Sequence, residues 1–135
     1  MEKKYTVLYI EDNQDNRVLV ERFLAFEGFK VYSVETGQKG LDKAPEILPD
    51  VFLIDVDLPD ISGHEVVDIL NHRIETQHIP KIVFTADDML REEGLKTTFN
   101  YFIRKPVDVN TLAAKIEYAI QHPHNCERRE LWASP

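Results

Sequence analysis

The strongest indication of the fold comes from residues 51–63, which read Val51-Phe52-Leu53-Ile54-Asp55-Val56-Asp57-Leu58-Pro59-Asp60-Ile61-Ser62-Gly63. The first four residues are all apolar, which is typical of a strand covered on both faces. Asp55 follows directly, and Pro59 and Gly63 indicate a turn before the next element. We therefore expect a central strand of a parallel sheet that ends in a carboxylate.

Similar short strands are expected on both sides of this one, at Thr6–Ile10, Lys30–Val34, Lys81–Phe84 and Tyr101–Arg104. Helical patterns lie between the strands, at residues 14–27, 37–44, 63–72, 87–96 and 108–121, and Pro45 is expected to stop the second. This alternation predicts an α/β fold, a (βα)5 flavodoxin-like doubly wound parallel sheet with strand order 2-1-3-4-5. In the first helix, one apolar side is predicted to contain Leu19, Val20, Phe23, Leu24 and Phe26.

Composition narrows the class of protein. The 135 residues suit one domain, predicted at 1–121, with 122–135 as a C-terminal tail or linker stub. The formal charge of −8 argues against direct DNA binding, because nucleic-acid surfaces are basic. Cys126 has no cysteine partner, the apolar runs are too short for a membrane span, and the start leaves no room for a signal-peptide core. We therefore expect a cytoplasmic protein.

Polar residues gather where the predicted strands end. Glu11 and Asp12 follow the first strand, Asp55 the third, Thr85 the fourth and Lys105 the fifth. Carboxyl ends of parallel strands share one edge of the sheet, where ligands bind. Three clustered carboxylates repel one another unless a cation neutralises them, and a site with only oxygen ligands favours Mg²⁺. A lysine and a hydroxyl can hold phosphoryl oxygens, so the set suits phosphoryl transfer to Asp55.

Each of these residues also has an ordinary interpretation when taken alone. Glu11 and Asp12 could favour the start of a helix, and Asp55 and Asp57 could be turn acids. Lys105 could be a solvated surface lysine. The joint occurrence at four strand ends favours the phosphoryl-transfer interpretation.

At this point the sequence resembles the receiver domain of two-component response regulators, across about residues 5–121. The resemblance is carried by Glu11-Asp12-Asn13, by the block 55–63, by Thr85-Ala86 and by Lys105-Pro106. It implies a CheY-like domain of the single-domain or hybrid-kinase type. One departure is the segment between Thr85 and Lys105, which is shorter than the family pattern.

The resemblance implies a role for each matching position. Asp55 would accept the phosphoryl group, and Lys105 and Thr85 would hold its oxygens. Mg²⁺, for which Mn²⁺ can substitute, would be held by the residues Glu11, Asp12, Asp55 and the Asp57 backbone carbonyl.

The resemblance also implies a switch. Thr85 and Phe102 would move together, with an inward Phe102 ring well populated at rest because phenylalanine lacks the hydroxyl of the commoner tyrosine. Asp57 and Asp87 would modulate the lifetime of the phosphoryl group, unless they are merely solvated loop acids. The Lys105–Pro106 bond is expected to be cis.

Partners follow from the same resemblance. The phosphoryl donor would be a sensor histidine kinase or a histidine phosphotransfer protein, and the output would be protein–protein signalling by the fourth helix, fifth strand and fifth helix. The protein would not be a classical enzyme, although it would catalyse its own phosphorylation and dephosphorylation. We expect a monomer or weak dimer that contacts neither DNA nor membrane.

Three alternatives remain open from the sequence. Asp55-Val56-Asp57 also fits a haloacid-dehalogenase-type phosphatase, although that motif belongs on a first strand. A flavodoxin-like flavin carrier would share the sheet order but needs a phosphate loop that the acidic 11–16 segment does not provide. Residues 122–135 could also begin a linker to an output domain, and His122, His124 and Cys126 lack the fourth ligand of a closed metal site.

Overall fold

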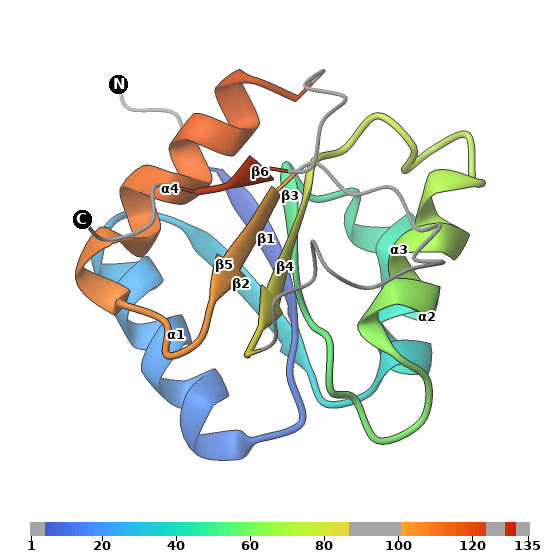
Figure 1. Ribbon diagram of the computed structural model, residues 1–135. Helices are drawn as coiled ribbons and strands as arrows, with labels where there is room; N and C mark the ends of the chain where they lie inside the picture. Colours follow the sequence, from blue (N-terminus) through green and yellow to red (C-terminus); the bar gives the residue numbers. More distant parts are fainter. Residues whose placement is uncertain (1–4, 87–100, 124–128, 132–135) are drawn as a thin grey trace.

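A parallel sheet with helices on both faces forms the molecule (Figure 1). The computed structural model describes residues 5–86, 101–123 and 129–131. Within these ranges the strands are β1 (Thr6–Ile10), β2 (Lys30–Val34), β3 (Val51–Asp55), β4 (Lys81–Thr85), β5 (Tyr101–Arg104) and β6 (Arg129–Glu130). None of the helices in this part of the chain combines the length and apolar character needed to cross a membrane.

The sheet order is β2-β1-β3-β4-β5-β6, and every neighbouring pair is parallel. The predicted order 2-1-3-4-5 is therefore confirmed, and β6 adds one strand beyond it. All residues of β3 and β4 are buried, as their apolar sequences predict. Each of these two strands extends one residue further than predicted, so Asp55 and Thr85 belong to the sheet itself.

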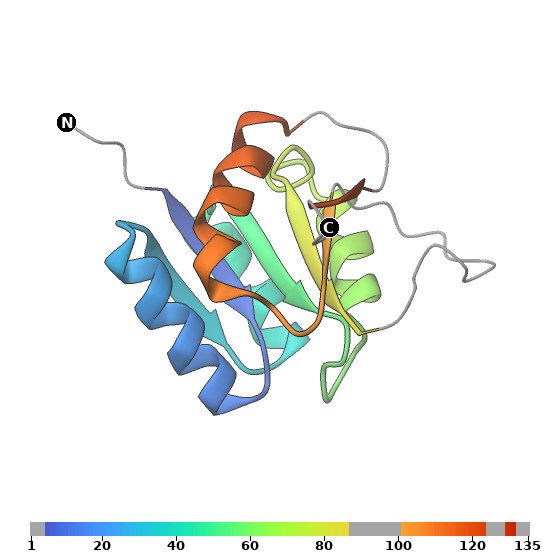
Figure 2. The same cartoon turned by 60° about the vertical axis from the view of Figure 1, so that its left-hand side comes forward.

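Within the described ranges, two helices pack on each face of the sheet (Figure 2). One face is covered by α1 (Gln14–Phe26) and α4 (Val109–Gln121), and the other by α2 (Gly37–Ile47) and α3 (Gly63–Asn71). The helix α4 is the predicted fifth helix, because the predicted helix 87–96 lies outside the described residues. Each helix begins after a side chain that accepts a backbone N–H of the first turn, from Asn13, Thr36, Ser62 or Asp108.

The prediction that Pro45 ends the second helix is wrong, because α2 runs through Pro45 to Ile47. Proline lacks the N–H that would bond to the carbonyl of Leu41, four residues earlier. In the structure Arg73 donates to that carbonyl instead, with Nη1 2.8 Å from the Leu41 oxygen. A side chain from beyond α3 therefore replaces the missing helical bond. The residue after the helix is Leu48, which caps it in a left-handed conformation with φ of 46°.

The predicted apolar side of the first helix is only partly correct. Val20 and Leu24 are buried, whereas Leu19, Phe23 and Phe26 are exposed, Phe26 at 89%. The buried pair is four residues apart and so lies on one narrow stripe. Helix α1 therefore contributes two core residues and leaves an apolar flank in contact with solvent.

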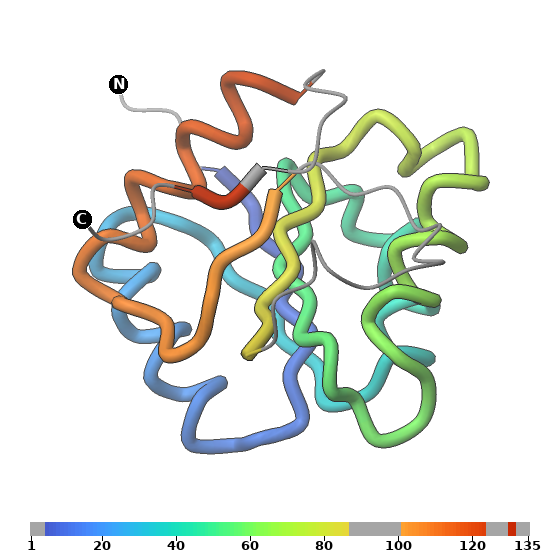
Figure 3. The backbone as a smooth tube through the Cα atoms, viewed as in Figure 1, coloured from blue at the N-terminus to red at the C-terminus, as the bar shows by residue number. Residues whose placement is uncertain are grey.

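The C-terminal segment contributes a strand that the sequence pattern does not predict. The two residues of β6 pair with β5, and Leu131 beyond them is buried in the core beneath α4. The backbone trace shows β6 beside the outer edge of β5 (Figure 3). Whether residues 122–135 form a linker stays a prediction, but Arg129 and Glu130 are part of the folded sheet and Leu131 packs in the core.

Candidate functional site

The predicted site residues meet at one edge of the sheet, at the lower end of the strands in Figure 1. Glu11 and Asp12 follow β1, Asp55 and Thr85 end β3 and β4, and Lys105 follows β5. This placement results from the parallel topology, because all the carboxyl ends point the same way. Residues far apart in the sequence are thereby brought together.

The acidic cluster consists of Glu11, Asp12 and Asp55, whose nearest ligand oxygens all lie within 4.8 Å of one another. Glu11 and Asp55 are each only 3% exposed, whereas Asp12 is open to solvent. Burial, together with the neighbouring Asp55 carboxylate, raises the pKa of Glu11 to about 7. A cluster whose negative charge is this unfavourable fits a divalent cation with oxygen ligands.

Lys105 provides the positive charge of the site. Its Nζ lies 2.7 Å from Oδ1 of Asp55 and 3.9 Å from Oδ2 of Asp57. Burial alone would lower the pKa of Lys105, but the hydrogen bond and charge of Asp55 outweigh it, so the pKa is raised. The Lys105 backbone N–H donates to the Thr85 carbonyl at 2.8 Å, and the bond to Pro106 is cis. The ammonium group is thus fixed against the central carboxylate.

The remaining predicted residues are placed as follows. Thr85 is 1% exposed at the end of β4, and Phe102 is fully buried in β5. The Asp57 side chain is exposed, while its backbone N–H donates to Oδ1 of Asp55 at 3.0 Å. Asp87 lies outside the described residues.

Three donors surround the Glu11 carboxylate, and sequence reasoning identified none of them. The Tyr9 hydroxyl and the Asn16 side-chain amide approach Oε1 at 3.3 and 3.4 Å, and the Asn13 backbone N–H approaches Oε2 at 3.3 Å. Burial and the Glu11 charge raise the pKa of Tyr9, so its hydroxyl keeps the proton that it donates. Strand alternation could have identified Tyr9, because residues 9 and 11 share a face.

The turn after β1 is held by Arg17. Its Nη1 lies 2.8 Å from the carbonyl oxygen of Glu11 and 3.0 Å from that of Asp12. The guanidinium group therefore fixes the backbone that presents both acids.

Gly63 allows α3 to begin directly against the phosphoryl-accepting candidate. A Cβ at this position would lie 2.3 Å from the carbonyl oxygen of Asp55. This distance is far shorter than a van der Waals contact, and the atom in the way belongs to the backbone of Asp55. Only glycine therefore fits at this position. The block 55–63 therefore needs its glycine for packing as well as for the turn.

A cavity of about 570 Å³ opens beside the acids, between α1 and the loop that leads to α4. Glu11 and Lys105 line this cavity together with the apolar side chains of Leu19, Val20 and Val107.

Fold and site together define an α/β domain with an acidic cluster and an opposed lysine at the carboxyl edge of its sheet. The family model of the response regulator receiver domain matches residues 7–117. The chain therefore belongs to the response regulator receiver domain family. This membership argues against the phosphatase and flavin-carrier alternatives, which need other folds or loops.

Relatives with similar sequences support this family assignment. The chain is 33% identical to the polar-differentiation response regulator DivK of Brucella ovis over 110 residues, which cover 77% of this chain and 86% of DivK. It is also 28% identical to Histidine kinase P4 of Formosa agariphila over 122 residues. That match covers 89% of this chain but only 9% of the kinase.

Solved structures share the fold. The receiver domain of the sensor histidine kinase PA1611 from Pseudomonas aeruginosa is 25% identical with a TM-score of 0.80, and the match covers 88% of this chain and 99% of that one. That structure has a magnesium ion coordinated in its active-site cleft. A CheY-like receiver domain protein from Methanospirillum hungatei has a TM-score of 0.81 at 24% identity, over 90% of this chain and 97% of that one.

Proposed function

We propose that this chain accepts a phosphoryl group on Asp55 from a phosphohistidine of a sensor histidine kinase or histidine phosphotransfer protein. The observation that carries the proposal is the Asp55 carboxylate itself, which is 3% exposed and lies 2.7 Å from the Lys105 ammonium within the acidic cluster. A structural ion pair would need no further acids, whereas these acids add charge that must be neutralised.

In the proposed step, an Asp55 carboxylate oxygen forms a bond to phosphorus as the bond from phosphorus to the donor histidine nitrogen breaks. The electron pair of that bond stays on the imidazole nitrogen. Lys105 would follow the transferring group, because its ammonium can exchange the Asp55 oxygen for a phosphoryl oxygen. The Thr85 hydroxyl, on the neighbouring strand, would donate to a second phosphoryl oxygen.

The proposed metal is Mg²⁺, for which Mn²⁺ can substitute. Asp12, Asp55 and the Asp57 carbonyl would hold it directly, and Glu11 would act largely through water. When bound, the metal neutralises the carboxylates and the phosphoryl oxygens. Burial, and after it the neighbouring Asp55 carboxylate, raises the pKa of Glu11. This supports the assignment, because a cation in the cluster would favour the charged form of Glu11.

The proposed output is a change in the surface made of the predicted fourth helix, β5 and α4. Thr85 and Phe102 would form the switch, and Asp57 and Asp87 would set the phosphoryl lifetime. Phe102 is fully buried, which supports an inward ring in the resting protein.

A comparison of dephosphorylation rates between wild type and Asp87→Asn tests whether Asp87 sets the phosphoryl lifetime. Equal rates would show that Asp87 has no such role.

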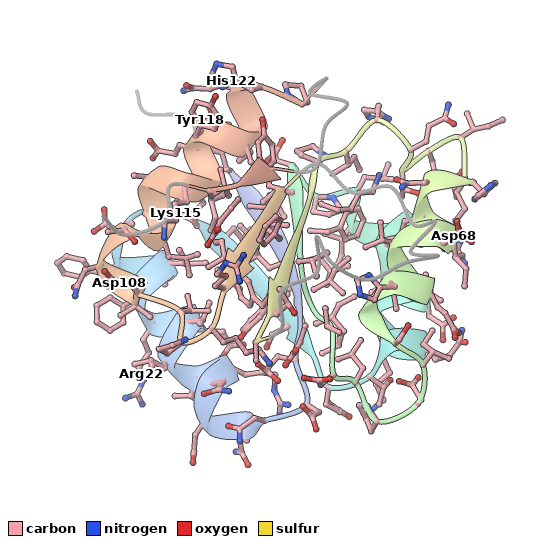
Figure 4. All side chains as sticks on the ribbon, viewed as in Figure 1. Arg22, Asp68, Asp108, Lys115, Tyr118 and His122 are labelled. Carbon is pink, nitrogen blue, oxygen red and sulfur yellow. The ribbon has the colours of Figure 1, made fainter. Side chains whose placement is uncertain are left out.

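The test is intact mass after incubation with acetyl phosphate, with and without Mg²⁺. Wild type should gain one phosphoryl group only with Mg²⁺, and Asp55→Asn should gain none. Asp68→Asn is the matched control, because Asp68 points away from the body of the molecule on α3 (Figure 4) and its side chain is 57% exposed. Phosphorylation of Asp55→Asn to the wild-type level would contradict the proposal.

A further inference from the structure

The outer edge of β5 is occupied by a segment from the same chain. β6 pairs in parallel with β5, so Arg129 lies opposite Tyr101 and Glu130 opposite Phe102. The next residue, Leu131, donates its backbone N–H to the Phe102 carbonyl at 2.9 Å. Edge strands present such backbone groups to any segment that can pair with them.

An apolar anchor supports this short pairing. Leu131 is 2% exposed and belongs to the core cluster that contains Leu112 and Ile116 of α4. Two ladder residues alone would add little stability, whereas a buried leucine side chain contributes substantially. The segment is therefore docked by its side chain as well as by its backbone.

The end of α4 is fixed close to the start of β5. The Tyr101 hydroxyl donates to the His122 carbonyl at 2.8 Å, and the rings of Tyr118 and His122 stack with centroids 4.1 Å apart (Figure 4). The chain therefore leaves α4 beside the strand to which residues 129–131 return.

A charged contact links β6 to the ring of Phe102. Oε1 of Glu130 lies 3.0 Å from Nε of Arg104, and the Arg104 guanidinium carbon lies 5.7 Å from the centroid of the Phe102 ring. Residues 102 and 104 share one face of the strand, so Glu130 holds the guanidinium beside the fully buried ring. Loss of β6 would release both the backbone of Phe102 and its cationic neighbour.

We propose that the edge of β5 is a strand-docking surface whose occupant is residues 129–131 of the same chain, and that docking favours the buried position of Phe102. The coupling to phosphorylation rests on the proposed function, in which Phe102 and Thr85 form the switch. The structural link runs through Arg104, which pairs with Thr85 across β4 and β5 and whose guanidinium lies beside the Phe102 ring. Binding free energies are reciprocal, so a phosphoryl group that favours buried Phe102 must also strengthen docking.

Hydrogen exchange of the full chain tests the docking. The amide of Leu131 should be protected in the free protein, because it donates to the Phe102 carbonyl. Addition of beryllofluoride, a mimic of the phosphoryl group, together with Mg²⁺ should increase that protection. Exchange of Leu131 at the rate of an unstructured peptide would overturn docking, and unchanged protection on saturation with beryllofluoride would overturn the coupling.

Two variants test the reciprocal effect. Leu131→Ala removes the apolar anchor, and Glu130→Gln removes the carboxylate charge that pairs with Arg104. Both variants should therefore bind beryllofluoride more weakly than wild type, Leu131→Ala by about five-fold or more. The matched controls are Ile74→Ala and Glu46→Gln, because Ile74 is 83% exposed and the Glu46 side chain 67%. Equal affinities in all five proteins would overturn the coupling.

The two proposals fail in different ways. Absence of both a phosphoryl adduct and beryllofluoride binding in wild type would contradict the proposed function, while protection of Leu131 in the free protein would still support docking. If wild type is phosphorylated, but its beryllofluoride affinity is unchanged by the β6 variants and beryllofluoride does not change the protection of Leu131, only the coupling would be contradicted.

Discussion

The environment of Glu11 is unfavourable to its negative charge. Burial and the nearby Asp55 raise its pKa from 4.5 to about 7. Between these values, the folded protein holds a proton that the unfolded chain has lost. The free energy of unfolding of the metal-free protein should therefore fall as the pH rises from about 4.5 to about 7, as far as this group is concerned.

The measurement is urea unfolding at several pH values without metal, on wild type and Glu11→Gln. The variant should lose most of this pH dependence, because an amide does not titrate in this range. Glu46→Gln serves as the control, since its side chain is 67% exposed. An identical slope in wild type and Glu11→Gln would show that other groups cause the dependence.

A second prediction at the scale of one residue concerns Gly63. A methyl group at this position would meet the Asp55 carbonyl oxygen at 2.3 Å, so the backbone of one of the two must move. We expect Gly63→Ala to lower the free energy of unfolding by about 1–3 kcal/mol, measured by urea unfolding. We also expect slower phosphorylation by acetyl phosphate, because Asp55 shifts. Full stability in the variant would mean that the turn adapts freely.

At the scale of one element, α2 depends on a residue outside itself. Pro45 leaves the Leu41 carbonyl without a helical donor, and Arg73 supplies one at 2.8 Å. Arg73→Met should therefore cost about 1–3 kcal/mol of unfolding free energy, because it leaves a carbonyl unsatisfied. The same substitution should cost less in a Pro45→Ala background, where the backbone N–H of residue 45 can bond to Leu41.

A double-mutant cycle by urea unfolding measures this coupling. The interaction free energy between positions 45 and 73 should differ clearly from zero. Strict additivity of the two substitutions would mean that Arg73 does not compensate for the proline in α2.

The elements also show where sequence patterns succeed and where they do not. β3 and β4 were predictable because a short continuous apolar run, four residues in β3 and three in β4, is typical of a buried strand. α2 was wrongly shortened because the compensating Arg73 lies 32 positions from Leu41 in sequence. β6 was missed because two polar residues have no periodicity, and only the burial of Leu131 in the folded chain reveals their role.

For the whole molecule, Mg²⁺ should stabilise the folded state, because only the folded state gathers Glu11, Asp12 and Asp55 within 4.8 Å. Thermal unfolding at neutral pH should show a Tm that rises with Mg²⁺ concentration. Asp12→Asn should weaken this dependence, whereas Asp68→Asn should preserve it. A Tm of wild type that is insensitive to millimolar Mg²⁺ would contradict a metal site of useful affinity.

The arrangement of the site as a whole was largely predictable. Parallel topology alone places Glu11, Asp55, Thr85 and Lys105 at one edge, because the strand ends were recognisable. The residues that support them were harder to predict. Strand alternation places Tyr9 on the same face as Glu11, whereas the contact of Arg17 with the Glu11 carbonyl does not follow from motif spacing.

The most direct test of the proposed phosphoryl transfer is to locate the phosphoryl group on the chain. After reaction with acetyl phosphate and Mg²⁺, borohydride reduction converts a phosphorylated aspartate into homoserine, and fragment masses identify the residue. We expect the change at Asp55 alone, because its carboxylate is the one held by Lys105 at the centre of the cluster. A label on Asp12 or Asp57 instead would contradict the assignment of Asp55 as the acceptor.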